Sequence, residues 1–171
     1  KVVIGYENGG LPKTTRPVFI TSPDDVGRLV WNNYCYANLA TFLWRKEVSS
    51  LGKPAIIAKG CDVKAIVVLI QESQIKREDV VILGVTCTGV GDPPLSKCAI
   101  CDVNTPREYD HLFGEEIPPK TDINKFADVE EFEKKSPQER WQFWEKQLEK
   151  CIKCYACRPV TAFWACEVCI A

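Results

Sequence analysis

The feature that most constrains the fold is a strand, helix, strand unit in the first half of the chain. PAIIAK at 54–59 and DVVILGV at 79–85 are continuous apolar runs, as expected of strands that are buried on both faces. Between them, CDVKAIVVLIQES at 61–73 carries apolar residues at helical spacing. A helix between two such strands predicts a right-handed crossover that joins parallel neighbours of one sheet.

Further apolar runs precede this unit. KVVIGY at 1–6 predicts a strand that leads into an ENGG turn, and PVFI at 17–20 predicts another. SPDD at 22–25 has the capping serine and following proline of a helix start. We expect this helix to run to about Val48, with a break near Asn32.

These elements predict an α/β fold with an open, mostly parallel sheet and flanking helices over residues 1–92. Residues 93–127 lack periodicity and are rich in proline, so we expect an irregular, cysteine-containing excursion. Residues 128–171 combine a helix with a cysteine run that is predicted to bind a cluster. We expect the three parts to form one compact unit.

A second helix is predicted over 136–150, where S-P-Q-E forms a capping box. Trp141, Trp144 and Leu148 fall on one face of this helix. Large apolar residues at helical spacing usually belong to the core, so we expect them to pack the helix against the sheet. The functional alternative is an electron relay or a flavin stack.

Two cysteines directly follow predicted strands. Cys61 lies in KGCD and Cys87 in TCTGVGD, just after the runs at 54–59 and 79–85. In an open parallel sheet, sites form outside the carboxyl ends of the strands. We therefore expect both thiols at one edge as metal ligands, the alternative being that each is a small buried filler.

The excursion adds a C-x2-C pair, Cys98 and Cys101. A pair on so tight a turn lets both sulfurs face one ion, as in zinc and iron-sulfur sites. The single histidine, His111, lies in the same segment without a nucleophile motif. We therefore expect an exposed or structural imidazole there rather than a Cys-His hydrolase.

The C-terminal run begins C-x2-C-x2-C, like a bacterial ferredoxin cluster sequence. Thr161 and Ala162 stand where the fourth cysteine and its proline would follow. Three thiols in close series favour an iron-sulfur cluster over zinc, with the fourth ligand supplied from elsewhere. A zinc site would need only one C-x2-C pair from each of two places. The cysteines of this run are Cys151, Cys154, Cys157, Cys166 and Cys169.

The chain has ten cysteines, enough for one or two 4Fe-4S clusters with four thiolates each. The C-x2-C-x2-C run and one remote thiol form the first predicted site. Cys87, Cys98 and Cys101 with one further thiol form the second. Cys35, among aromatic neighbours on a predicted helix, is expected to be structural. The thiols that compete for the two open positions are Cys61, Cys166 and Cys169.

The charges nearly cancel, with 22 Lys and Arg against 23 Asp and Glu. This balance gives no reason to expect nucleic acid or an anionic membrane as a partner. No apolar window reaches the length of a membrane span, and the N-terminus lacks the pattern of a signal peptide. We expect the chain in the reducing cytoplasm, where paired cysteines are metal ligands rather than disulfides.

Several segments carry a family resemblance: KVVIGYE, PVFITSPDDVGRLVWNNYCYANLATFL, KGCDVKAIVVLIQESQIKREDVVILGV, KCAICDVNTPREYD and CIKCYACR. Over nearly its whole length, the chain resembles the iron-sulfur proteins related to the beta subunits of coenzyme F-420 (deazaflavin) reducing hydrogenases and dehydrogenases. The resemblance implies electron transfer within an anaerobic multi-subunit complex, beside a hydrogenase, formate dehydrogenase or heterodisulfide reductase-like subunit. Thr161, Ala162 and Trp164 stand where family members tend to carry Cys, Pro and Cys.

We therefore predict a non-catalytic electron-transfer subunit of an oxidoreductase complex. One alternative is a flavin- or deazaflavin-dependent oxidoreductase whose GYENGG and TGVGD loops cradle a phosphate, although the chain has no G-x-G-x-x-G run. Another is a zinc-stabilised structural or interaction subunit. Lys59, Lys64 and Arg107 lie near the cysteine loops and are candidates to tune a cluster potential.

Overall fold

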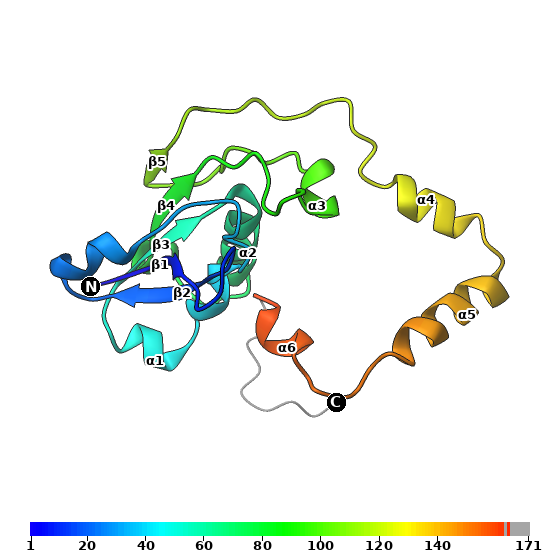
Figure 1. Ribbon diagram of the computed structural model, residues 1–171, viewed down its shortest axis with the longest axis horizontal. Coiled ribbons are helices and arrows are strands. Elements are labelled where there is room, and N and C mark those ends of the chain that lie inside the picture. The colour runs from blue at the N-terminus through cyan, green and yellow to red at the C-terminus, as the bar shows by residue number, and fades with distance from the viewer. Residues whose placement is uncertain (163, 165–171) are drawn as a thin grey trace.

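A mixed sheet of five strands organises the described part of the chain, residues 1–162 and 164 of a computed structural model (Figure 1). The strand order is β2-β1-β3-β4-β5, with β1 and β2 antiparallel and the other neighbours parallel. This confirms the predicted α/β class with its largely parallel sheet. The strands are β1 (Val2–Asn8), β2 (Thr15–Ile20), β3 (Pro54–Ala58), β4 (Val81–Val85) and β5 (His111–Phe113).

Two long helices have the positions that the sequence predicts: α2 (Gly60–Gln71) between β3 and β4, and α5 (Pro137–Leu148). At the start of α5, Ser136 and Glu139 each accept a hydrogen bond from the other's backbone N–H. No helix in the described residues is long and apolar enough to cross a membrane. The shorter helices are α1 (Lys46–Ser49), α3 (Ser96–Ala99), α4 (Ala127–Glu133), α6 (Cys157–Val160) and the 3₁₀ helices η1 (Pro23–Arg28), η2 (Leu39–Phe42) and η3 (Arg77–Asp79).

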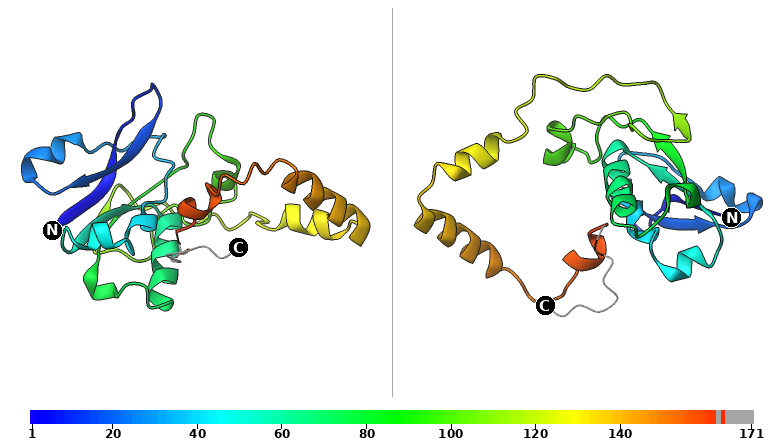
Figure 2. Two further views of the ribbon diagram at one scale, coloured as in Figure 1. Left: turned by 90° about the horizontal axis from the view of Figure 1, so that it is seen from below. Right: turned by 180° about the vertical axis from the view of Figure 1, so that it is seen from behind.

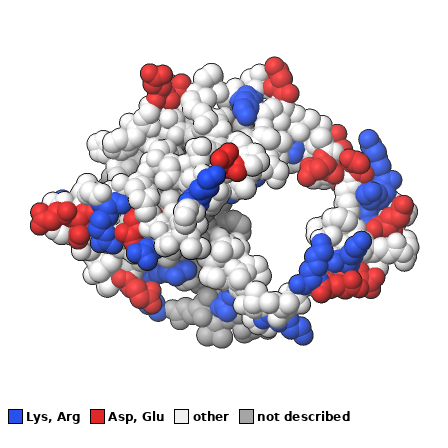
Figure 3. Space-filling model, in the orientation of Figure 1, with Lys and Arg blue, Asp and Glu red and all other residues white. Residues whose placement is uncertain are grey.

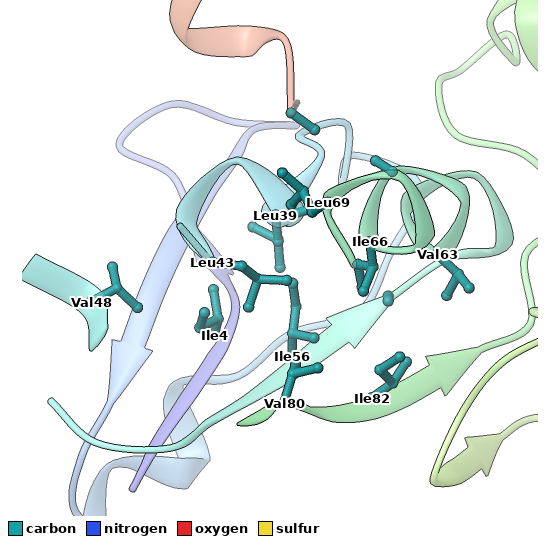
Figure 4. Close-up of a cluster of buried hydrophobic side chains, with 14 of the residues drawn as sticks. Ile4, Leu39, Leu43, Val48, Ile56, Val63, Ile66, Leu69, Val80 and Ile82 are labelled. Atoms are coloured by element: carbon teal, nitrogen blue, oxygen red, sulfur yellow. The ribbon is translucent and has the colours of Figure 1, made fainter. Parts of the chain in front are cut away.

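The hydrophobic core lies between one face of the sheet and the elements α2 and η2 (Figure 4). Ile4, Ile56 and Ile82 form one row across β1, β3 and β4, because they are partners in the strand register. Ile66 and Leu69 of α2 cover this row and are fully buried. Each such side chain contributes about 1.5–3 kcal/mol on burial, so this layer fixes α2 against the strands.

The helix predicted from Ser22 to about Val48, with a break near Asn32, is wrong, because only three short helical segments lie in this range. Ser22 does begin a helical turn, η1, but the chain then leaves the helix and hydrogen-bonds to the sheet, where Val30 N–H donates to Tyr6 O at 2.8 Å. Asn32 next forms a turn in which its Oδ1 accepts from Tyr34 N–H at 2.8 Å. The segment that contains the buried Cys35 is therefore a loop rather than a helix.

The loop after β1 closes a hairpin instead of leading into a helix. β1 continues through Asn8, and the chain returns into β2, with Gly9 N–H donating to Thr14 O at 2.8 Å. The sheet is therefore mixed at this edge. The GYENGG segment consequently has no following helix N-terminus of the kind that binds a phosphate, which removes the geometric basis for that prediction.

The excursion predicted over 93–127 is irregular except for two short elements. It contains α3, and it supplies β5, which pairs in parallel with β4 at the edge of the sheet. The exposed His111 begins β5. The excursion thus completes the sheet as well as carrying a cysteine pair.

Residues 122–156, here called the arm, stand away from the sheet (Figure 2). Trp141 is 66% exposed and Leu148 is 70% exposed, so the prediction that this face of α5 packs on the sheet is wrong. The aromatic rings instead meet within the arm, where Phe132 of α4 lies 5.9 Å from the ring of Trp144. Beyond the arm, Ala162 is buried in the hydrophobic core. Figure 3 shows the opening between the arm and the rest of the described protein.

Candidate cysteine site

A cavity of about 330 Å³ lies at the carboxyl ends of β3 and β4. Four cysteines that the sequence proposes as ligands line it. They come from three segments: the first turn of α2, the loop after β4, and the region of α3. Apolar residues, including Val90, Ile100 and Phe126, form much of the remaining wall. The four cysteines are Cys61, Cys87, Cys98 and Cys101.

The excursion packs directly against the start of α2. A Cβ added at Gly60 would lie 1.9 Å from the carbonyl oxygen of Val103, so only glycine allows this approach. The end of the excursion is also tied to β4, because Cys87 N–H donates to Asn104 O at 2.8 Å and Asn104 Nδ2 donates to Cys87 O at 2.7 Å. These contacts bring sequence-distant thiols to one place.

The loop after β4 directs backbone N–H groups at two of the sulfurs. Val90 N–H donates to Cys98 Sγ at 3.4 Å, and the backbone N–H of Gly89 bonds to Cys87 and favours its thiolate. Gly89 has a φ of 133°, a conformation that side chains disfavour, and its Cβ position lies 3.3 Å from Cys98 Cβ. Hydrogen bonds of this kind stabilise a negatively charged sulfur.

Four lysines line the cavity, against one described acid, Asp102. Lys125 and Lys64 contact Asp102, and these ammonium groups lower the pKa of its carboxyl to about 2. The sequence interpretation included Lys59 and Lys64 but missed Lys97 and Lys125. Arg107, also proposed from the sequence, lies 3.9 Å from Asp102 and is not among the lining residues. The lining therefore suits an anionic group.

Burial opposes the ionisation of two of the cavity thiols, Cys61 and Cys87. Desolvation raises the pKa of Cys61 to about 11, although the residue keeps exposed area, and burial also raises the pKa of Cys87. Both thiols are therefore protonated at neutral pH when no metal is bound. Metal binding would release these protons.

Asn104 is a cavity residue that the sequence interpretation missed. Its side chain is buried, its Nδ2 is bound to Cys87 O, and its Oδ1 has no hydrogen-bond partner among the described residues. The only signal in the sequence that points to Asn104 is its place three residues after Cys101. An acceptor left unpaired in a buried wall marks a position that a bound group with a donor would satisfy.

The C-x2-C-x2-C run forms a separate, exposed loop after α5. Cys151, Cys154 and Cys157 do not line the cavity. Lys153 and Tyr155 between them each have a φ of 56°, an unusual conformation for residues with side chains. Lys153 N–H donates to Cys151 Sγ at 3.4 Å. Strained backbone of this kind clusters at functional sites.

The remaining cysteines lie elsewhere. Cys35 is fully buried in the loop that precedes η2 and is not a lining residue of the cavity. Cys166 and Cys169, proposed as competing ligands, lie outside the described residues. The structure thus brings four thiols together around the cavity and leaves the three thiols of the C-x2-C-x2-C run exposed after α5.

No protein-family model matches this chain, and a search of curated proteins also gave no match. The family resemblance therefore stays a prediction from sequence motifs.

Proposed function

We propose that the chain is an iron-sulfur electron-transfer subunit. The observation that carries this proposal is the convergence of four thiols on one cavity at the carboxyl edge of the parallel strands. A 4Fe-4S cluster takes four thiolates and, when bound, supplies one-electron chemistry. The residues that would hold it are Cys61, Cys87, Cys98 and Cys101.

The donor set fits a cluster better than a zinc ion. Structural zinc needs four ligands about 2.0–2.3 Å from a single centre. The four thiols surround about 330 Å³ of space, more than a single ion fills. That space and its lysine-rich wall suit a larger, anionic group.

The second thiol set gives the proposed subunit a point of contact with a partner. Cys151, Cys154 and Cys157 would supply three thiolates of another cluster, with a fourth ligand from elsewhere. Their exposure leaves this site accessible to another redox subunit. From the family resemblance, we propose a cytoplasmic complex in which that partner is a hydrogenase, formate dehydrogenase or heterodisulfide reductase-like subunit.

A flavin- or deazaflavin-dependent oxidoreductase is the second candidate function, favoured by Asn104. A flavin ring has an apolar body and an N–H donor, which match the apolar wall and the unpaired Asn104 Oδ1. The cavity volume lies at the lower end of the range of about 300–1,000 Å³ for ligand pockets. A yellow chromophore released on denaturation, without bound iron, would favour this function over the first.

The test is anaerobic purification with measurement of iron, acid-labile sulfide and zinc per chain, and an absorption spectrum before and after dithionite. Two clusters predict about eight irons and eight sulfides, with a broad band that dithionite bleaches. One equivalent of zinc without visible absorbance would contradict the proposal and leave a structural or interaction subunit.

Cysteine variants then assign the two sites. Cys98→Ser should remove about four irons, and Cys154→Ser should remove the other four. Cys35→Ala is the matched control, because this thiol is buried away from the cavity, and it should leave the iron content unchanged. Equal loss of iron in all three variants would indicate misfolding rather than loss of ligands.

A further inference from the structure

Exposed lysines lie at the edge of the cysteine cavity. Three of them line the cavity and are nevertheless open to solvent, with 61% of the Lys64 side chain and 39% of the Lys125 side chain accessible. A fourth, Lys120, comes from the excursion and donates to Ala99 O at 3.5 Å, next to Cys98 in the chain. The four lysines, here called the basic rim, are Lys64, Lys97, Lys120 and Lys125.

The basic rim carries more positive charge than its neighbours neutralise. Asp102, the one described acid that lines the cavity, contacts Lys64 and Lys125. Lys97 and Lys120 form no ion pair with any described residue. The whole chain has a formal net charge of -1, so this excess is local. Unpaired ammonium groups at a surface produce a positive potential, which attracts anionic partners and which salt screens.

Apolar side chains lie beside these charges. Phe126 is 65% exposed and Ile100 is 42% exposed, and both line the cavity. An aromatic and an aliphatic side chain bordered by charged groups is the composition of a protein–protein contact, which has an apolar centre and a polar border. A free anion gains nothing from exposed apolar groups. The combination therefore fits the surface of an acidic protein better than a small anion.

The basic rim and the proposed cluster ligands belong to one place in the fold. Lys97 directly precedes Cys98, and three of the rim lysines line the same cavity as the four thiols. A protein seated on the rim would bring its own redox group close to a cluster held by these thiols. Electron transfer between proteins requires such proximity, and the contacts that provide it are often small and weak.

We infer that the basic rim is the docking surface for an acidic electron-carrier protein, which exchanges one electron with the cluster proposed at the cavity. The inference rests on the proposed function. The reduced carrier loses one electron and the cluster gains it, or the reverse, and no bond is formed or broken. Charge complementarity of this kind speeds the encounter and selects partners of opposite charge. The exposed C-x2-C-x2-C run after α5 is left as the place of contact with the other redox partner.

The experiment measures the binding of an acidic plant-type 2Fe-2S ferredoxin, in its oxidised form, to the anaerobically purified full chain by isothermal titration calorimetry. The double variant Lys97→Gln, Lys120→Gln removes the two unpaired charges and leaves Asp102 with its partners. We expect its dissociation constant to rise at least about fivefold near 0.01 M ionic strength. The difference should shrink near 0.15 M, because the Debye length falls from about 30 Å to about 8 Å.

Three controls accompany the double variant. Lys76→Gln changes an exposed lysine that precedes β4, at the opposite edge of the sheet from the cavity, and should leave the affinity unchanged. Lys153→Gln tests the exposed C-x2-C-x2-C run as an alternative docking place for the ferredoxin. A basic c-type cytochrome replaces the ferredoxin in the third control, and the double variant should not weaken its binding, because fewer positive charges then oppose it.

Weaker ferredoxin binding in the double variant, with the controls as expected, supports the inference. Absence of ferredoxin binding, an equal loss in Lys76→Gln, or a larger loss in Lys153→Gln would overturn it. Hexacyanocobaltate(III), a small trivalent anion, is titrated in the same way. If this anion bound to the basic rim and the ferredoxin did not, the rim would be a small-anion site and the inference would be wrong.

Failure of the proposed function is visible separately, as a wild-type chain without iron and sulfide, and the calorimetry would still show whether the basic rim binds an acidic protein. The double variant should keep the iron content of the wild type, which shows that its cavity is intact. If it loses iron, Lys120→Gln decides alone. A rise of at least about twofold in the dissociation constant of that variant supports the inference, and an unchanged value rejects it.

Discussion

Asn104 and Cys87 hold each other by two hydrogen bonds that run in opposite directions. Cys87 N–H donates to Asn104 O at 2.8 Å, and Asn104 Nδ2 donates to Cys87 O at 2.7 Å. These two hydrogen bonds fasten the segment that carries Cys98 and Cys101 to the loop directly after β4. This tie therefore helps to set the relative position of three cavity thiols.

Asn104→Ala should lower the free energy of unfolding by about 1–2 kcal/mol, since it removes a hydrogen bond to the partly buried carbonyl of Cys87. It should also reduce the iron retained per chain. Chemical denaturation and iron analysis measure the two effects. Asn8→Ala, at an exposed asparagine of β1, is the control and should change neither quantity. Unaltered iron and stability in Asn104→Ala would show that the side-chain hydrogen bond of this tie does not position the thiols.

Gly60→Ala should lower the free energy of unfolding by about 1–3 kcal/mol through overpacking, because the new methyl group would meet the Val103 carbonyl 1.9 Å away. Urea denaturation gives the value. Gly27→Ala is the matched control, since nothing lies within 4 Å of its Cβ position. Equal stability of the two variants would mean that the excursion does not rest on the first turn of α2.

The edge of the sheet that carries the cavity could be predicted from the sequence. Two apolar runs with a helix between them require parallel strands, and parallel strands end at the same edge, so Cys61 and Cys87 had to lie near each other. The partners of these cysteines were harder to predict. The places of Asn104 and of the lysine-rich wall depend on how an irregular excursion folds back, and no periodic pattern encodes that.

Two local patterns predicted the wrong packing. The helix start at Ser22 is real, yet hydrogen bonds to β1, such as that from Val30, end the helix after two turns. The apolar face of α5 was expected to meet the sheet, but the sheet already has α2 and η2 on its core face. Amphipathic spacing predicts that one face of a helix is apolar. It does not specify which part of the protein that face packs against.

Trp141→Ala should change the stability of the isolated chain by less than about 0.5 kcal/mol, because the ring is 66% exposed. Ile66→Ala, which truncates a fully buried side chain of α2, should cost about 2–5 kcal/mol. Urea denaturation of both variants provides the comparison. If Trp141→Ala lowered the free energy of unfolding by more than about 2 kcal/mol, α5 would have to pack against the sheet domain in solution.

Asp110 joins the edge strand to the rest of the sheet. Its Oδ1 accepts from Arg77 at 2.9 Å and its Oδ2 accepts from Ile82 N–H at 2.7 Å. The Arg77 hydrogen bond, with help from that N–H, lowers the pKa of Asp110 below its ordinary value. The carboxylate therefore stabilises the folded state above the unfolded pKa of about 3.9, and this contribution is lost as the pH falls through the lower folded pKa.

Asp110→Asn should accordingly cost no more than about 1.5 kcal/mol at pH 7, since the side chain is partly exposed and solvent screens its charge. The difference from wild type should shrink as the pH is lowered below about 4. Urea denaturation at several pH values measures it, with Glu108→Gln, an exposed carboxylate of the same segment, as the control. A difference that stays constant from pH 7 to pH 2.5 would show that the Asp110 carboxylate is not ionically paired in the folded chain.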